Sequence, residues 1–371
     1  MIPTLEFIAT EEALALAGAR LAQSPWLAID TEFMRVSTYY PELCLVQVAT
    51  ATELLCIDTL ALPEPVPLLR LLEDPGREKL IHAGRQDLEV LLLLAGIVPA
   101  PVFDTQIAAA LLGHPDQVSY AWLVEKFCGV ALDKSQTRTD WKRRPLSPEQ
   151  VRYAAMDCWY LSAVAGVLKE ELAANGKLGW CEEECARLVR PAAYRAEPEL
   201  AWQRVKGIGQ LTPGQFPAAM RLAAWRERLA QAANRPRGWI LKDDVLLALV
   251  REGPTTRAAV AGLPGMPPAF ARRHADAVLE LLHAATAPAA VDLGALPRRL
   301  APEEAKIVER LMAGVQERAT ALAVVAPLIA SRKDLEAAVR GRRDLRIFEG
   351  WRAEVLGEVL RAELPPAGDQ R

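Results

Sequence analysis

The first half of the chain alternates between two hydrophobic patterns, beginning with short apolar runs. Short apolar runs bounded by turn-forming residues predict strands at 26–30, 43–50, 53–58 and 79–84. The first three strands are separated by only a few residues, so we expect them to pair as an antiparallel meander.

Between and after these strands, apolar residues recur at helical spacing. Residues 63–74 predict a short helix, and residues 85–96 predict a helix that ends at a glycine. Ser147 followed by Pro148 is a strong N-cap signature, and it predicts one long helix over 147–176. The pattern predicts a mixed sheet flanked by helices up to about residue 170, then a connecting helix and a linker.

The second half has no strand-like alternation. It consists of segments rich in Ala, Leu and Arg at helical spacing, broken by Pro and Gly. The helical pattern of residues 202–286 is repeated in residues 300–365, which suggests a duplication of an all-helical unit. We therefore expect an all-α second half made of two related domains.

Composition indicates a globular protein of two or three domains. The chain has 371 residues, of which 51% are hydrophobic and 25% are charged. It has no uncharged apolar run long enough for a membrane span, and its acidic N-terminus does not resemble a signal peptide. The six cysteines are scattered in apolar segments, as is typical of reduced, buried thiols. We therefore expect a cytoplasmic protein.

The charge is distributed unevenly. Residues 1–189 contain 16 basic and 26 acidic side chains, whereas residues 190–371 contain 28 basic and 21 acidic ones. An acidic half suited to cations is thus joined to a basic half suited to polyanions.

The acidic half contains a set of carboxylates that the predicted elements could bring together. Asp30 and Glu32 end the first strand of the meander and lie on one face, because strand side chains alternate. Asp87 lies in the first turn of a helix, a position that the helix dipole alone favours. Tyr153 and Asp157 are one helical turn apart. Each feature alone is common in solvent-facing positions, but their joint occurrence suggests a cation site.

The chemistry of such a set is specific. Four carboxylates could hold two divalent cations ~3.5–4 Å apart, the separation used for phosphodiester cleavage. Carboxylate oxygens are hard ligands, which Mg²⁺ or Mn²⁺ prefers. A phenol such as that of Tyr153 could orient the attacking water, whereas its ordinary pKa of about 10 makes it a poor base. This interpretation needs no small-molecule cofactor.

Three segments carry a resemblance to a known family. "IDTEFMR", "LIHAGRQDLEVL" and "LDKSQTRTDWKRRPLSPEQVRYAAMDCWYL" resemble the three exonuclease motifs of ribonuclease D, a member of the DEDD superfamily, in its subtype with a tyrosine in the third motif. This resemblance covers about residues 1–185. In the second half, "AAWRERLAQAANRPRGWILKDDVLLALV" resembles the HRDC domain that follows the nuclease in that family, and the later helical unit would be a diverged second copy.

The resemblance implies a fold and a function. The fold would be an α/β ribonuclease-H-like exonuclease domain, residues 1–190, followed by all-α HRDC-type domains at 200–287 and 295–371. The activity would be that of a 3′→5′ exoribonuclease that trims tRNA precursors and other structured RNAs with two divalent metal ions, releasing nucleoside 5′-monophosphates. In this pattern Tyr153 positions the nucleophilic water. The implied metal ligands are Asp30, Glu32, Asp87 and Asp157.

Two groups of apolar and aromatic side chains are candidate substrate contacts. Phe33 and Met34 follow the acidic pair and could stack or wedge against the terminal bases, or they could simply pack in the core. Tyr39 and Tyr40 precede a proline and predict a turn with a possible substrate contact.

A basic cluster precedes the last helix of the first half. It could contact phosphates, or it could be a solvated loop. We take Lys134 and Arg138 as the candidate substrate ligands within it. The cluster consists of Lys134, Arg138, Lys142, Arg143 and Arg144.

Two other functions remain open at this point. A DNA 3′→5′ exonuclease of the same superfamily would use the same acids, because selection of RNA rests on contacts to the 2′-hydroxyl that the sequence does not reveal. A non-catalytic RNA-binding scaffold is disfavoured, since four clustered acids without a metal repel one another. The sequence implies no particular oligomeric state.

Overall fold

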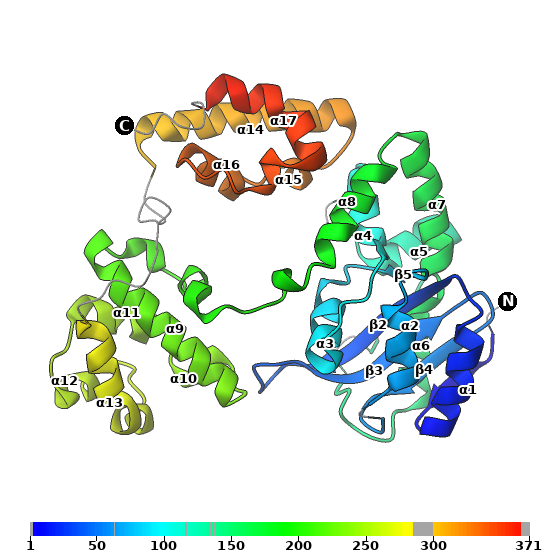
Figure 1. Cartoon of the computed structure of the whole chain (residues 1–371), viewed down its shortest axis with the longest axis horizontal. Helices are drawn as coiled ribbons and strands as arrows, with labels where there is room; N and C mark the ends of the chain where they lie inside the picture. Colours follow the sequence, from blue (N-terminus) through cyan, green and yellow to red (C-terminus); the bar gives the residue numbers. More distant parts are fainter. Residues whose placement is uncertain are drawn as a thin grey trace.

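The chain forms one α/β part and two helical parts (Figure 1). The computed structural model describes residues 3–62, 64–115, 117–133, 135–136, 139–284 and 300–364. We call residues 5–188 the sheet domain, residues 198–283 the first helical unit and residues 302–363 the second helical unit. The sheet domain lies at the right of Figure 1, the first helical unit at the lower left and the second at the top.

The sheet has six strands in the order β1-β4-β3-β2-β5-β6. β2, β3 and β4 form the predicted antiparallel meander. β1 pairs in parallel with β4 at one edge of the sheet. At the other edge, β5 pairs in parallel with β2, and β6 pairs in parallel with β5. The expectation for the meander is thus confirmed, whereas β1 and β6 were not predicted. The bounds are β1 Leu5–Ile8, β2 Trp26–Met34, β3 Glu42–Ala49, β4 Leu54–Asp58, β5 Glu78–Ile81 and β6 Val102–Asp104.

The central strand β2 carries a register shift beside its acidic residues. Asp30 pairs with Gln47 of β3 and Glu32 pairs with Leu45, but the register then shifts before Phe33. Such bulges bend a strand and re-aim the side chains next to them. The shift therefore lies where β2 leaves the acidic pair and approaches the β2–β3 hairpin.

Eight helices surround the sheet in the described part of this domain, and α6 packs against four of its strands. α6 begins at the predicted cap, a capping box of Ser147 and Gln150. The predicted single helix is wrong, however, because the chain breaks at Tyr160, whose backbone N–H donates to the hydroxyl of Tyr120 at 2.9 Å. The helices are α1 Glu11–Leu21, α2 Val66–Glu73, α3 Arg85–Ala95, α4 Thr105–Leu111, α5 Tyr120–Cys128, α6 Pro148–Trp159, α7 Leu161–Ala174 and α8 Leu178–Leu188.

The two helical units share one order of elements. Each has a long helix, a four-residue helix, a medium helix, a short turn of helix and a final long helix. This agreement supports the duplication that the sequence suggests. The first unit contains η2 Pro198–Arg204, α9 Phe216–Ala232, α10 Arg237–Ile240, α11 Asp243–Glu252, α12 Arg257–Ala261 and α13 Pro268–His283. The second contains α14 Pro302–Leu322, α15 Ala326–Ile329, α16 Arg332–Val339, η6 Arg346–Phe348 and α17 Gly350–Glu363.

The units differ in their cores. The first unit has a hydrophobic core of its own, built around residues such as Trp202, Phe216 and Val278. Buried residues of the second unit, including Leu311 and Leu356, belong to the same continuous cluster as the core of the sheet domain. The second unit is therefore part of the sheet domain's packing, although its predicted limits, 295–371, extend beyond the described residues.

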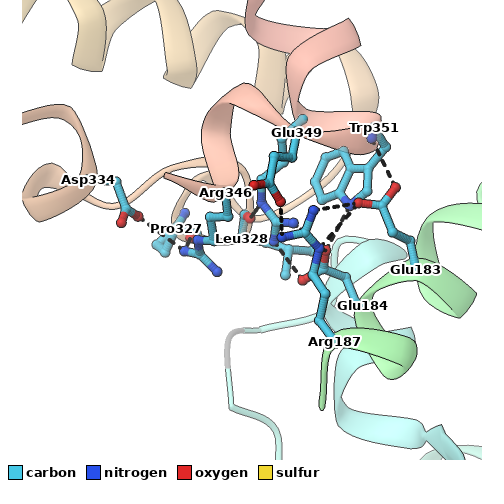
Figure 2. Close-up of polar contacts among 10 residues, drawn as sticks. Glu183, Glu184, Arg187, Pro327, Leu328, Asp334, Arg346, Glu349 and Trp351 are labelled. Atoms are coloured by element: carbon cyan, nitrogen blue, oxygen red, sulfur yellow. Dashed lines mark hydrogen bonds and ion pairs between the residues drawn. The ribbon is translucent and has the colours of Figure 1, made fainter. Parts of the chain in front are cut away.

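The junction between the second unit and α8 is polar as well as apolar (Figure 2). The indoles of Trp180 and Trp351 stack with ring centroids 4.7 Å apart. Arg352 is fully buried, forms a two-point ion pair with Glu184 of α8, and donates from its Nε to the carbonyl of Leu328 at 3.0 Å. Because this guanidinium offsets the effect of burial, the pKa of Glu184 lies below its usual value.

Two general features follow from the described residues. No helix there combines the length and apolar character that a bilayer crossing requires. All six cysteines are free thiols, and five of them are buried. The predicted pattern of buried, unpaired cysteines is thus confirmed.

Candidate active site

Three of the predicted carboxylates converge from two elements. Asp30 and Glu32 project from β2, and Asp157 projects toward them from α6, which crosses that strand. One carboxylate oxygen from each residue lies within 4.8 Å of the others, which is close enough for a shared metal ion. Residues far apart in the sequence are thus brought to one place by the packing of α6 on the sheet.

Asp87 lies beside this group. It is the third residue of α3, in the first turn as predicted, and the hydroxyl of Thr31 donates a hydrogen bond to its Oδ1. Its negative charge raises the pKa of both Asp30 and Glu32. All four acids therefore act on one another, although Asp87 is not within the tight group of three.

The electrostatics of the four acids favour the binding of a cation. Burial, followed by the neighbouring carboxylates, raises the pKa of Glu32 to about 8 and that of Asp30 well above its usual range. Burial also raises the pKa of Asp157 to about 7 and that of Asp87 to about 6. A cation among the carboxylates would reverse these shifts. An oxygen-only donor set with this electrostatic strain fits hard divalent ions.

Tyr153 lies at the edge of the same group. It precedes Asp157 by one turn of α6, and a hydrogen bond from its side chain counteracts the raised pKa of that acid. Its ring stacks against Trp141, with centroids 6.3 Å apart and an interplanar angle of 28°. The hydroxyl is therefore held close to the carboxylates in a fixed orientation.

Sequence reasoning missed a residue that positions α3. Asp104 is buried, and its carboxylate accepts hydrogen bonds from the backbone N–H groups of Ala83 and Gly84, each at 3.0 Å, and of Gln106 at 2.8 Å. It thus ties the start of α4 to the turn that leads into the helix of Asp87. The local signal was present, since Asp104 stands between an apolar strand and a helix, as an N-cap residue does.

The predicted substrate contacts have different outcomes. Phe33 and Met34 are partly buried and pack against the core, in line with the structural alternative, so a contact with RNA stays a prediction for both. Lys134 and Arg138 lie outside the described residues.

Two other members of the basic cluster have structural partners. Lys142 forms an ion pair with Glu42 at 2.7 Å, and Arg144 binds Asp58 at 2.7 Å. Arg143 is exposed. The cluster is therefore partly engaged in holding the loop to β3 and β4.

The predicted substrate contact at the turn of Tyr39 and Tyr40 is wrong for Tyr39. Its side chain is only 6% exposed, and its hydroxyl donates to Glu227 in α9 of the first helical unit. The side-chain oxygen of Asn234 accepts hydrogen bonds from the backbone N–H groups of Tyr39, at 3.1 Å, and Tyr40, at 3.0 Å. The tip of the β2–β3 hairpin thus contacts the first helical unit, as Figure 1 also shows.

Comparisons with known proteins agree with this geometry. A family model described as a 3′-5′ exonuclease matches residues 5–173, and one described as an HRDC domain matches residues 215–282. The chain is 41% identical to ribonuclease D of Acidiphilium cryptum, over 96% of this chain and 92% of the relative. It is 37% identical to ribonuclease D of Pseudomonas paraeruginosa, over 96% and 97% respectively.

A solved structure extends the likeness to three dimensions. The crystal structure of Escherichia coli RNase D matches with a TM-score of 0.87 and 32% identity, over 98% of each chain. That protein is described as an exoribonuclease involved in structured RNA processing. Sequence and fold both agree over nearly the whole length. The chain therefore belongs to the ribonuclease D family of 3′–5′ exoribonucleases, whose exonuclease domain depends on divalent metal ions.

Proposed function

We propose that this protein trims the 3′ ends of tRNA precursors and other structured RNAs, and releases nucleoside 5′-monophosphates by two-metal hydrolysis. The observation that carries the proposal is the convergence of Asp30, Glu32 and Asp157 within 4.8 Å, with Asp87 beside them. Full-length similarity to an exoribonuclease that processes structured RNA supports the choice of substrate.

The metal ligands in this proposal are the four acids. Asp30, Glu32, Asp87 and Asp157 offer only carboxylate oxygens, which suits Mg²⁺ or Mn²⁺. When bound, the two ions supply the positive charge that lowers the pKa of the attacking water and stabilises the leaving oxygen. Their charge also allows all four carboxylates to ionise together near neutral pH.

The remaining work falls to groups of this chain. The hydroxyl of Tyr153, fixed by Trp141 and by its hydrogen bond to Asp157, orients the water that attacks the terminal phosphodiester. The water's oxygen forms the new bond to phosphorus as the bond between phosphorus and the 3′ oxygen of the shortened strand breaks. The water releases a proton to solvent, and the leaving 3′ oxygen takes one up. Two residues hold Asp87 in place. Thr31 donates a hydrogen bond to the carboxylate of Asp87, and Asp104 binds the turn that precedes α3.

The experiment compares a 3′-end-labelled tRNA precursor with single-stranded DNA, in Mg²⁺, in Mn²⁺ and with chelator. We expect label to be released from RNA only when metal is present. Equal release from DNA would instead favour a DNA exonuclease, and RNA binding without product in any metal would favour a scaffold. We also propose that the protein acts in the cytoplasm, in keeping with its six free thiols.

A further inference from the structure

A solvent-exposed tryptophan on the first helical unit has no part in the site described so far. Of the nine tryptophans, all of which lie in the described part of the chain, Trp239 alone is exposed, at 62%. It is the third residue of the four-residue helix α10. A large aromatic ring left in water is a candidate contact for a partner with an apolar, flat surface.

The surroundings of Trp239 are basic. Arg235 and Lys242 flank it closely in sequence, and both are exposed. The first helical unit as a whole has a strong excess of positive charge, with 12 basic and 6 acidic residues over 200–284. Over residues 300–364 the second unit has 11 of each. The positive charge expected to attract a polyanion is therefore concentrated in the unit that carries the exposed tryptophan.

The same place in the second helical unit is partly buried and packs against the core shared with the sheet domain. There the third residue of the four-residue helix is Leu328, whose carbonyl accepts from Arg352, and that arginine binds Glu184 of α8. The second unit thus uses this position at its contact with the sheet domain. In the first unit the corresponding side chain, Trp239, faces solvent instead.

The helix that carries Trp239 is also linked to the hairpin that leads to the active site. Arg237 of α10 forms an ion pair with Glu227, the residue that binds the hairpin tip through Tyr39. From Glu32 to Tyr39 the chain has seven residues, a reach of at most ~25 Å. Residues two apart in a helix point ~200° apart, so the side chains of Trp239 and Arg237 leave α10 in roughly opposite directions. A strand whose 3′ end lies at the acids would need only a short length to approach α10.

We propose that Trp239, with Arg235 and Lys242, is a stacking site for an unpaired base of the RNA strand, upstream of the nucleotide that is removed. Stacking on an open indole requires a base that is not enclosed in a duplex, and the two cations suit the adjacent phosphates. The occupant is therefore single-stranded RNA. This inference deepens the proposed function and rests on it for the identity of the strand.

Binding in the absence of divalent metal provides the first test. We expect Trp239→Ala to weaken the binding of a single-stranded RNA of about 12 nucleotides about ten-fold, as measured by fluorescence anisotropy. Trp239→Phe keeps a ring and should retain most of the affinity. Leu16→Ala, which truncates another exposed apolar side chain far from this unit in sequence, is the matched control and should bind like wild type. Unchanged affinity in Trp239→Ala would overturn the proposal.

Two further measurements separate stacking from other roles. Lys242→Ala should reduce the slope of log affinity against log salt by about one, because it removes one phosphate contact. A fully duplexed RNA should bind Trp239→Ala and wild type equally. An equal loss of affinity for duplex and single strand would show that the tryptophan does not stack on unpaired bases.

Turnover distinguishes the failure of this inference from the failure of the proposed function. In Mg²⁺, Trp239→Ala should raise KM for the single strand about ten-fold and leave kcat unchanged, because the acids are untouched. If wild type degrades RNA and Trp239→Ala has the same KM, the stacking site is wrong and the nuclease assignment stands. If wild type degrades no RNA but the variant still loses affinity, the stacking site stands and the nuclease assignment fails.

Discussion

The two helical units have the same order of elements but opposite relations to the rest of the molecule. The first has its own core and an excess of positive charge, and it exposes Trp239. The second is balanced in charge, and its buried residues continue the core of the sheet domain. The same arrangement of helices thus exposes a positively charged surface in the first unit and packs against the sheet domain in the second. The difference lies in the side chains, because a fold alone does not determine function.

The ways in which the units attach to the sheet domain differ accordingly. The first unit meets it at the tip of one hairpin, through Tyr39 and Asn234. The second unit is held along α8 by a stacked pair of tryptophans and a buried ion pair. We therefore expect the first unit to control how RNA is held and the second to control how stably the catalytic domain folds.

The largest expected effect separates chemistry from RNA binding. Asp30→Asn removes a charge that the metal site requires, so we expect turnover to fall by at least about 10³-fold, since metal ions contribute several kcal/mol to such reactions. RNA affinity without metal should stay within two- to three-fold of wild type, since we assign binding to the first unit. Release of mononucleotides from labelled RNA and anisotropy measure the two quantities. Normal turnover would remove Asp30 from the mechanism.

The next effect tests the difference in attachment directly. Arg352→Ala leaves the partly buried Glu184 with only the indole N–H of Trp351 at 3.0 Å and Arg187 at 3.9 Å, and the loss of one member of a buried pair costs up to about 3–5 kcal/mol of unfolding free energy. Because the two cores are continuous, we expect urea to unfold the sheet domain of this variant at a lower concentration, with activity lost in the same transition.

A matched change in the first unit should behave differently. Arg226 is also buried and binds Asp243 at 2.7 Å, but both residues belong to the first unit. Arg226→Ala should therefore unfold that unit early and leave the transition of the sheet domain in place. Arg310→Ala, which breaks a solvent-screened ion pair with Glu363, should change stability much less than either buried variant. One shared transition in both buried variants would contradict the contrast between the units.

A third effect concerns a path from the second unit to the metal site. The thiol of Cys185 in α8 accepts from the backbone N–H of Asp104 at 3.4 Å, and Asp104 anchors the turn before Asp87. Asp104→Asn replaces one acceptor oxygen with a donor, so the N–H of Ala83 or Gly84 loses its partner. We expect the half-saturating Mn²⁺ concentration to rise about ten-fold, with little change in KM for RNA, because a lost buried hydrogen bond costs about 1–3 kcal/mol.

The control for this prediction is a capping carboxylate elsewhere. Asp334 caps α16 with Ser331 in the second unit, away from the acids in the fold. Asp334→Asn should lower stability by a similar amount but leave the Mn²⁺ titration unchanged. A Mn²⁺ requirement that shifts equally in both variants would show that Asp104 acts only through general stability.

The sequence predicted those parts of the fold that depend on neighbouring residues, and it missed those that depend on contacts between residues far apart in the chain. The strands β2 to β5 and the start of α6 were predicted because short apolar runs between turn residues and the Ser147 cap are local signals. The strands β1 and β6, of four and three residues, were missed, whereas β5, also of four residues, was predicted from the apolar run that precedes Gly84. The break at Tyr160 was missed because its cause is the hydroxyl of Tyr120, a contact between residues 40 positions apart.

The same distinction applies to the site. Asp30, Glu32, Asp87 and Asp157 were found because each occupies a recognisable place on a strand or helix. The contact of Tyr39 with Glu227 and the burial of Arg352 against Glu184 leave no trace in either local sequence. Such contacts join segments more than 100 residues apart, and only the folded chain shows that one helical unit is structural and the other is open.

The smallest expected effect is a pH dependence of stability that only the sheet domain should show. In the native protein the pKa values of Glu32, Asp157 and Asp87 are raised to about 8, 7 and 6, above their unfolded values near 4. Between about pH 4 and pH 8 the native state then binds more protons than the unfolded state, so stability falls as pH rises. Without metal, we expect the sheet domain's melting temperature to fall by a few degrees from pH 5 to pH 8, and Mg²⁺ to reverse this fall most strongly at pH 8.

Two variants serve as controls for this pH dependence. Glu32→Gln cannot ionise at this position, so it should flatten the slope of melting temperature against pH. The early transition of the first unit in Arg226→Ala should not respond to Mg²⁺. A metal response in that transition would mean that the two regions are coupled through the hairpin more tightly than their separate cores imply.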